Sequence, residues 1–138
     1  MRTTVIGALV ALAIAAPAGA HHSVSAEFDQ NRPVTFTGVV SKIEWTNPHI
    51  YTHVEAKGPD GKVVEYRVEG GPPNALYRRG VTKDSLPNGV EILVEGFRAK
   101  DGSLRGNGRD LTFADGRRLF VGSSGTGAPR DGRDKAEK

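Results

Sequence analysis

The clearest structural signal lies in residues 50–69, which have the sequence IYTHVEAKGPDGKVVEYRVE. In both halves of this segment apolar or β-branched residues alternate with polar ones, as in half-buried antiparallel strands. The central Gly58-Pro59-Asp60-Gly61 is typical of a hairpin loop. The pattern therefore predicts two paired strands, over residues 50–57 and 63–69.

Upstream of this hairpin, residues 34–45 predict another strand because they are long and rich in β-branched residues. The apolar positions change parity along this strand, and Gly38 lies near the change. A bulge or bend is therefore expected near Gly38.

Downstream of the hairpin, residues 74–79 predict a short helix, and a fourth strand is expected over residues 90–97. Asp115-Gly116 then marks a last hairpin. This order of elements is that of a small, mainly β, OB-like barrel with five to six strands and one short helix. An open sandwich or roll of the same strands is the alternative fold.

The chain begins with the pattern of an export signal: Arg2, then an apolar run, then the small-residue cleavage site Ala18-Gly19-Ala20. We expect a cleaved signal peptide over residues 1–20 and an OB-like domain over 21–122. A disordered tail is expected over 123–138, where Gly, Ser, Pro and charged residues dominate. The mature protein is accordingly expected to be periplasmic or secreted, with no membrane span after cleavage.

The composition excludes several classes of function. The chain has no cysteine, which rules out disulfides, cysteine-ligated zinc, iron–sulfur clusters and thiol catalysis. A domain of about 100 residues is too small for a two-domain enzyme. The formal net charge of +3 gives no argument for nucleic acid, which we do not expect as a partner. No Ser-His-Asp arrangement is visible, so we favour a binding protein over an enzyme.

The histidines point to a metal site. All four lie in one part of the chain, as His21, His22, His49 and His53. Cleavage after Ala20 would give His21 a free α-amine beside its imidazole, and the two groups together can chelate a metal. One more imidazole completes a three-nitrogen set, which suits Cu(II), whereas the mature chain has no Met or Cys for Cu(I). We therefore predict a Cu(II) site with ligands drawn from these four residues.

Strand geometry limits the choice of ligands. On one extended strand His49 and His53 would lie about 13 Å apart, too far to bind one ion together. We therefore favour His21 with either His49 or His53. The alternative without a metal is that His21 and His22 are flexible residues left by cleavage. His49 would then hydrogen-bond within its turn, and His53 would be an ordinary outward-facing strand residue.

Three further residues are candidates for ligand contacts. Glu44 could orient His49 through a hydrogen bond, or it could be a solvated strand residue. Trp45 could stack on a ligand or belong to the core. Arg79 could bind an anion, although arginine at a helix C-terminus is also favourable without any ligand.

Several motifs extend over nearly the whole mature chain: His21-His22-Ser23, Phe28-Asp29, Thr37-Gly38-Val39-Val40, Glu44-Trp45-Thr46-Asn47-Pro48-His49, the Gly-Pro-Pro-Asn-x-Leu-x-Arg-x-Gly segment over 71–80, and Ala114-Asp115-Gly116-Arg117. On these motifs the chain resembles a family of small exported bacterial proteins of unknown function. The resemblance implies the compartment and the architecture. It implies no activity and no catalytic residue.

The sequence thus leaves three functions open. The first is an exported binding protein that holds Cu(II) through the mature N-terminal His21. The second is a metal-free periplasmic adaptor or envelope module that binds a peptide, a glycan or an anion. The third is a copper oxidase-type enzyme that uses the same N-terminal histidine. Metal content separates the first two, and turnover that depends on oxygen or peroxide separates the third.

Overall fold

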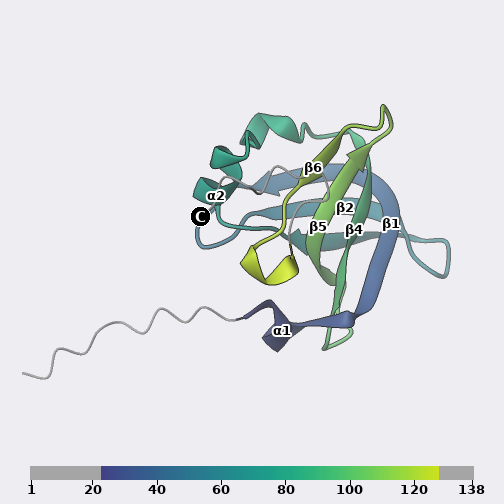
Figure 1. The fold of residues 1–138 in the computed structure, drawn as a ribbon. Coiled ribbons are helices and arrows are strands. Elements are labelled where there is room, and N and C mark those ends of the chain that lie inside the picture. The colour runs from purple at the N-terminus through teal and green to yellow at the C-terminus, as the bar shows by residue number, and fades with distance from the viewer. Residues whose placement is uncertain (1–22, 128–138) are drawn as a thin grey trace, which may run out of the picture.

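The computed structural model describes residues 23–127. His21, His22, the predicted signal peptide and residues 128–138 of the predicted tail lie outside the described residues. The described part has six strands (Figure 1): β1 Phe28–Glu44, β2 Tyr51–Lys57, β3 Val63–Glu69, β4 Glu91–Ala99, β5 Arg105–Phe113 and β6 Arg118–Phe120. Two short α-helices and two 3-10 turns complete it: α1 Val24–Glu27, α2 Pro73–Arg78, η1 Lys83–Ser85 and η2 Ser124–Thr126.

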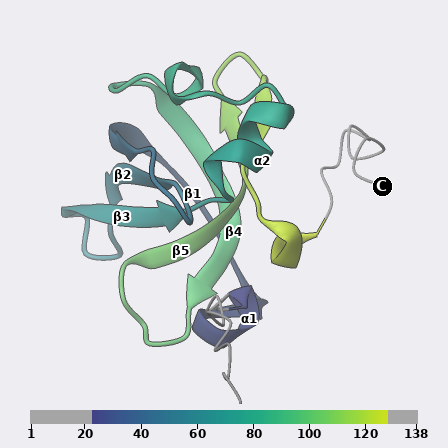
Figure 2. The same ribbon diagram turned by 90° about the vertical axis from the view of Figure 1, so that its left-hand side faces the viewer.

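The strands form one sheet in the order β3-β2-β1-β4-β5-β6. Neighbours in this order are antiparallel, and β3 pairs in addition with β5 in parallel. The pairings β3-β2-β1-β4-β5-β3 therefore return to their starting strand, and we call this set the strand circuit (Figure 2). The predicted mainly β architecture with a short helix is confirmed.

The predicted hairpin is present. Tyr51 pairs with Glu69 and Lys57 with Val63 across the loop at residues 58–62. Thr52 and Val54 are almost fully buried, at 1 % and 0 % exposure. Alternation along the chain therefore identified the inward face of this strand correctly.

The first strand is longer than predicted, and its irregularity lies elsewhere. β1 begins at Phe28, which is buried and pairs with Ala99 of β4. The β1–β2 register shifts between Val40 and Lys42 rather than at Gly38. Ahead of that bulge the buried apolar residue is Val40, and Val39 is exposed. The bulge, which adds one residue to one strand, accounts for the change of parity that the sequence displays.

Gly38 is instead required by close packing between strands. A Cβ atom at this position would lie 2.5 Å from the carbonyl oxygen of Glu55 and 2.7 Å from a methyl group of Val54. Distances this short cannot be relieved by a side-chain rotation, because the first of these atoms belongs to the backbone. The glycine therefore permits β1 to approach β2 closely.

The core and the ends of the sheet position the rest of the molecule. Buried residues of five strands, β1 to β5, form the main core, together with Leu86 and Val121. Helix α2 follows the end of β3 and packs on Ile50 through Leu76, as predicted for a short helix in this segment. The β2–β3 loop lies at the opposite end of β3, far from α2 (Figure 1). Beyond the predicted domain boundary at residue 122, Thr126 of η2 is buried.

Replacing Gly38 with alanine should destabilise the fold by about 1–3 kcal/mol, the usual cost of forcing extra volume into close packing. Gly58→Ala is the matched control, since a Cβ there would have only ordinary contacts of 3.4 Å or more. The free energy of unfolding from urea titrations of both variants checks the prediction. Equal stability of the two variants would contradict the close approach of β1 and β2.

Candidate functional site

A pocket of about 190 Å³ lies on the outer side of the sheet, beside α1. We call it the His49 pocket. Its walls combine acidic, basic and aromatic side chains with the start of the described chain: Ser23, Val24, Glu27, Phe28, Pro48, His49, Tyr51, Glu69 and Arg105. Four segments that are distant in sequence therefore contribute to one concave surface, a common arrangement at ligand sites.

The β2–β3 register positions the residues of one wall of the pocket. Tyr51 pairs with Glu69, and His49 lies two residues before Tyr51 in the connection that contains the cis Asn47-Pro48 peptide bond. The Nδ1 atom of His49 lies 3.0 Å from Oε1 of Glu69, and the two side chains are 25 % and 11 % exposed. The Nε2 atom of His49 has no hydrogen-bond partner among residues 23–127. Glu69 thus fixes the ring by one nitrogen and leaves the other available.

The electrostatics of this wall follow from burial. Desolvation raises the pKa of Glu69 above its ordinary value, and the nearby carboxylate of Glu27 raises it further, while His49 and Arg105 oppose the rise. Burial also raises the pKa of the Tyr51 hydroxyl, and the charge of Glu69 acts in the same direction. The guanidinium of Arg67 lies 3.5 Å from the centre of the Tyr51 ring and covers one of its faces.

The opposite wall depends on the parallel pairing of β3 with β5. In that pairing Arg67 is opposite Arg105, so Arg105 lies diagonally across from Glu69. Arg105 donates to Glu27 of α1 at 2.5 Å, which raises the pKa of the guanidinium above its ordinary value. Lys100 also donates to the Ser25 carbonyl at 2.6 Å.

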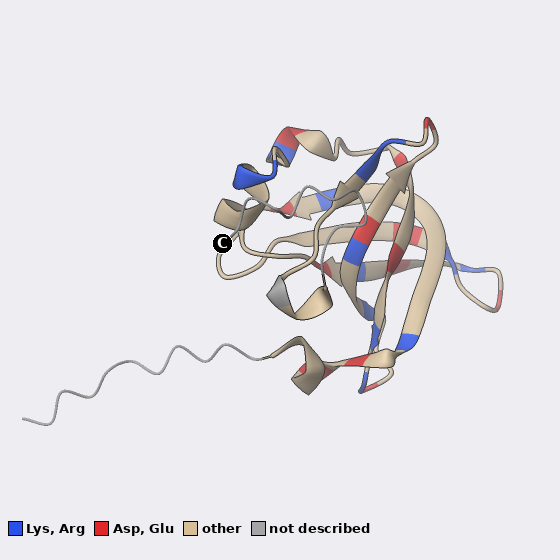
Figure 3. Cartoon of the chain, in the orientation of Figure 1, with Lys and Arg blue, Asp and Glu red and all other residues tan. Residues whose placement is uncertain are grey.

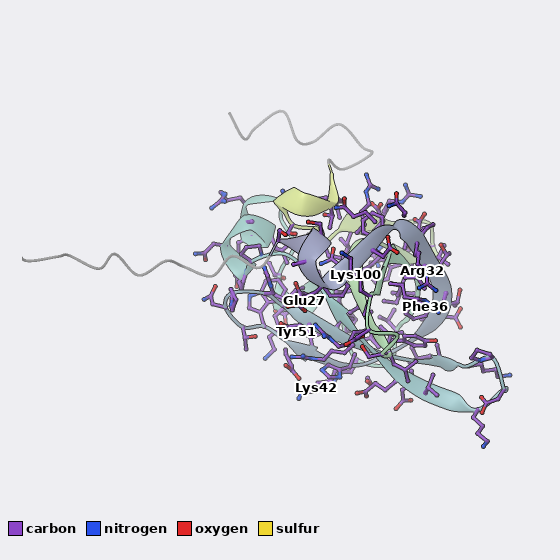
Figure 4. The ribbon with its side chains drawn as sticks, turned by 90° about the horizontal axis from the view of Figure 1, so that it is seen from below. Glu27, Arg32, Phe36, Lys42, Tyr51 and Lys100 are labelled. Carbon is purple, nitrogen blue, oxygen red and sulfur yellow. The ribbon has the colours of Figure 1, made fainter. Side chains whose placement is uncertain are left out.

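These contacts hold α1 against the sheet, and they bring Ser23 to the edge of the pocket. Figure 4 shows Glu27 and Tyr51 close to each other on the side of α1. The chain therefore enters the described part of the molecule beside the free nitrogen of His49.

His53 lies in a different environment, on the face of β2 between β1 and β3. Its Nε2 is 2.8 Å from Oε1 of Glu44, and its Nδ1 is 2.7 Å from Oε1 of Glu65. Ser41 also donates to Glu65, and Arg67 donates to Glu44. Both ring nitrogens of His53 are thus occupied by carboxylates, and only an imidazole protonated on both nitrogens can donate to both.

The prediction that Glu44 orients His49 is wrong, because Glu44 contacts His53. The reason is the β1–β2 register, which pairs Lys42 with His53 and so places Glu44 diagonally beside that ring. Hydrogen bonding from His53, assisted by Lys42, lowers the pKa of Glu44 to about 2. Hydrogen bonds from His53 and Ser41 also lower the pKa of Glu65.

Trp45 and Arg79 contact other residues of the fold rather than the pocket. The Trp45 ring meets Tyr77 edge-on, with centroids 5.8 Å apart, and packs against the small cluster around Ile50. Arg79 follows the end of α2 and donates to the Gly122 carbonyl at 3.1 Å, with its guanidinium 5.0 Å from the Phe120 ring. Neither residue lines the His49 pocket.

Sequence reasoning missed four residues of the pocket: Glu27, Tyr51, Glu69 and Arg105. The hairpin loop alone could have supplied two of them, since its register places Tyr51 opposite Glu69. Glu27 and Arg105 are separated by most of the chain and meet because β1 and β5 both pair with β4. Arg105 becomes a neighbour of Glu69 only through the β3–β5 pairing, for which the sequence carries no local signal.

Comparison with known proteins identifies a family whose function is unknown. Residues 8–108, which are most of the chain, match a protein family described as a family of unknown function (DUF6152), and the chain belongs to this family. No curated protein and no solved structure matches the chain.

The described residues contain neither a membrane-spanning helix nor a complete metal centre. No helix within residues 23–127 is long and apolar enough to cross a membrane. The same residues contain no group of three or more His, Cys, Asp or Glu side chains that could hold a metal ion. Acidic and basic side chains are interspersed over the strands (Figure 3).

The Glu44–His53–Glu65 network should make stability depend on pH in the acid range. The folded pKa of Glu44 is about 2 against an ordinary 4.5. Ionised Glu44 therefore contributes stability above about pH 4.5 that is lost as the pH falls toward 2. The melting temperature of wild type should exceed that of Glu44→Gln at neutral pH, and the difference should shrink steadily below pH 4.5.

The control for this measurement is Glu91→Gln, which removes an exposed carboxylate from the neighbouring strand β4, opposite Val39 and away from the network. Its melting temperature should stay parallel to that of wild type across the range. A difference between wild type and Glu44→Gln that stays constant from pH 7 to pH 2 would contradict the network.

Proposed function

We propose that the protein is an exported, periplasmic binding protein with an OB-like barrel that holds Cu(II) at its mature N-terminus. The ligands would be the α-amine and imidazole of His21, generated by cleavage after Ala20, and Nε2 of His49. The observation that carries the proposal is the His49 pocket, where one imidazole nitrogen is held by Glu69 and the other is available.

The length of the chain supports the choice of His21. Ser23 lines the His49 pocket, and α1 is tied down immediately after it by the Arg105–Glu27 and Lys100–Ser25 contacts. His21 is two residues before Ser23, a separation that spans at most about 7 Å of extended chain. The mature amine and its imidazole are therefore within reach of His49 without any change in the described structure.

The contacts of His49 and His53 support His49, rather than His53, as the metal ligand. Histidines that bind metals usually donate their second ring N–H to a carboxylate, which fixes the ring and increases its basicity. His49 has this arrangement with Glu69. His53 would have to release Glu44 or Glu65 before it could bind an ion. His22, the remaining candidate, is not one of the ligands in this proposal.

The fold supports the proposed OB-like barrel. In the strand circuit β1 pairs with both β2 and β4, and β3 pairs in parallel with β5, while α2 lies between β3 and β4 in sequence. A short helix at this point in a closed five-stranded sheet is the order expected of that barrel. A ligand in the His49 pocket, on the outer face beside Ser23, would then leave the core undisturbed.

Titration of the processed protein, beginning at His21, with Cu(II) tests the proposal. We expect one equivalent to bind and to give an electron paramagnetic resonance spectrum with nitrogen hyperfine structure. Binding should weaken below neutral pH, because protons compete for the amine and the imidazoles. The decisive comparison is a protein with one alanine added before His21, which should lose at least tenfold in affinity because the chelating amine is displaced.

Two single substitutions then identify the second imidazole. His49→Ala should weaken Cu(II) binding at least tenfold, whereas His53→Ala should leave the affinity of the folded protein unchanged. Glu69→Gln should weaken binding by about tenfold through loss of the carboxylate that orients His49. Competition with a chromogenic Cu(II) chelator measures all three. Equal affinity in wild type, the alanine-extended protein and His49→Ala would overturn the proposal and favour a metal-free binding module.

A further inference from the structure

A second pocket, of about 120 Å³, lies at the end of the strand circuit away from α2. We call it the Phe36 pocket. It is bounded by β1, β3 and β4, by the β2–β3 and β4–β5 loops and by the start of β5. The lining residues that matter below are Val34, Phe36, Tyr66, Arg98, Leu104 and Gly106. Its volume is close to that of an apolar cavity of about 150 Å³ that accommodates benzene.

The floor of the Phe36 pocket is an extension of the core. The rings of Phe36 and Tyr66 lie with centroids 4.4 Å apart at an angle of 31°, and both pack against the main core cluster. Leu104 forms part of the rim and is 44 % exposed. Gly106 has no side chain to fill the space, and a Cβ there would make only ordinary contacts, 3.4 Å from the Phe97 carbonyl oxygen and 3.9 Å from Val34. The pocket therefore offers an apolar wall that the protein does not cover itself.

A single cation at the rim is available to a ligand. Arg98 is exposed and makes no hydrogen bond or ion pair within the described part of the chain. Asp29, opposite Arg98 in the β1–β4 pairing, instead accepts from the Asn31 backbone amide at 3.0 Å. The other guanidinium of the pocket, on Arg105, is occupied by Glu27 and lies 3.9 Å from Asp101.

We propose that the Phe36 pocket binds small carboxylates that carry an aromatic ring or a short alkyl group. The apolar group would contact Phe36, Tyr66 and Leu104, and the carboxylate would pair with Arg98. A guanidinium matches a carboxylate with two parallel hydrogen bonds, so one arginine at the rim is sufficient to select the charge. The volume limits the apolar part to about one ring.

This proposal is independent of the copper site. The two pockets share only Arg105, and the proposed copper ligands do not line the Phe36 pocket. Arg98 and Leu104 both line this pocket, so a ligand with a free carboxylate next to its apolar group fits it better than one side chain of a peptide. Metal-free protein is therefore the right material for the test.

Titration of the metal-free, ¹⁵N-labelled protein with benzoate, followed by amide chemical shifts, tests the proposal. We expect saturable shifts confined to the β4–β5 loop, the start of β5 and residues around Phe36, with a Kd near 1 mM. Benzyl alcohol has the same ring without the charge and should bind at least tenfold more weakly. Acetate has the charge without the ring and should also bind at least tenfold more weakly.

Three variants complete the test. Arg98→Gln and Leu104→Ser, both at exposed positions that should fold normally, are each expected to weaken benzoate binding at least fivefold. Arg78→Gln, which removes the same charge on α2 at the other end of the molecule, should leave the Kd unchanged. Shifts that do not saturate, shifts spread over all basic residues, or equal Kd values for wild type and Arg98→Gln would overturn the proposal.

Discussion

The parallel pairing of β3 with β5 is the constraint on which the candidate site depends. It joins Arg67, Val68 and Glu69 to Arg105, Gly106 and Asn107, and so converts a meander of antiparallel strands into a closed circuit. Glu69 and Arg105 are consequently neighbours on the outer face. Arg105 then holds Glu27, and this ion pair fixes α1 and Ser23 beside His49. Without the β3–β5 pairing Glu69 and Arg105 would lie at opposite ends of the antiparallel series β3-β2-β1-β4-β5.

The two described histidines, His49 and His53, show how the strand register determines which contacts a side chain makes. They are four residues apart, but one lies in the connection before β2 and the other in its middle. His53 is enclosed by carboxylates from both neighbouring strands, which makes it part of a polar ladder across β1, β2 and β3. His49 meets a carboxylate on one side only. The same side chain therefore stabilises the sheet at one position and remains available for a ligand at the other.

Much of the fold was predictable because it depends on local signals. Alternation identified β2 and β3, and the Gly58-Pro59-Asp60-Gly61 motif identified the loop between them. The misplaced bulge in β1 shows the limit of this reasoning. The change of parity among the apolar positions indicated an extra residue in β1. Only the pairing with β2 shows that this bulge lies between Val40 and Lys42. The site was less predictable: the histidines were visible as residue types, whereas Glu27, Glu69 and Arg105 come together only through the closed circuit.

The most direct test of the central claim is a crystal structure of the processed protein, beginning at His21, grown with one equivalent of Cu(II). Our account predicts a single anomalous peak beside the His49 pocket, bound by the amine and ring of His21 and by Nε2 of His49, with Nδ1 of His49 still on Glu69. Copper bound at His53 or at surface carboxylates would contradict it, as would copper held by the N-terminus away from His49.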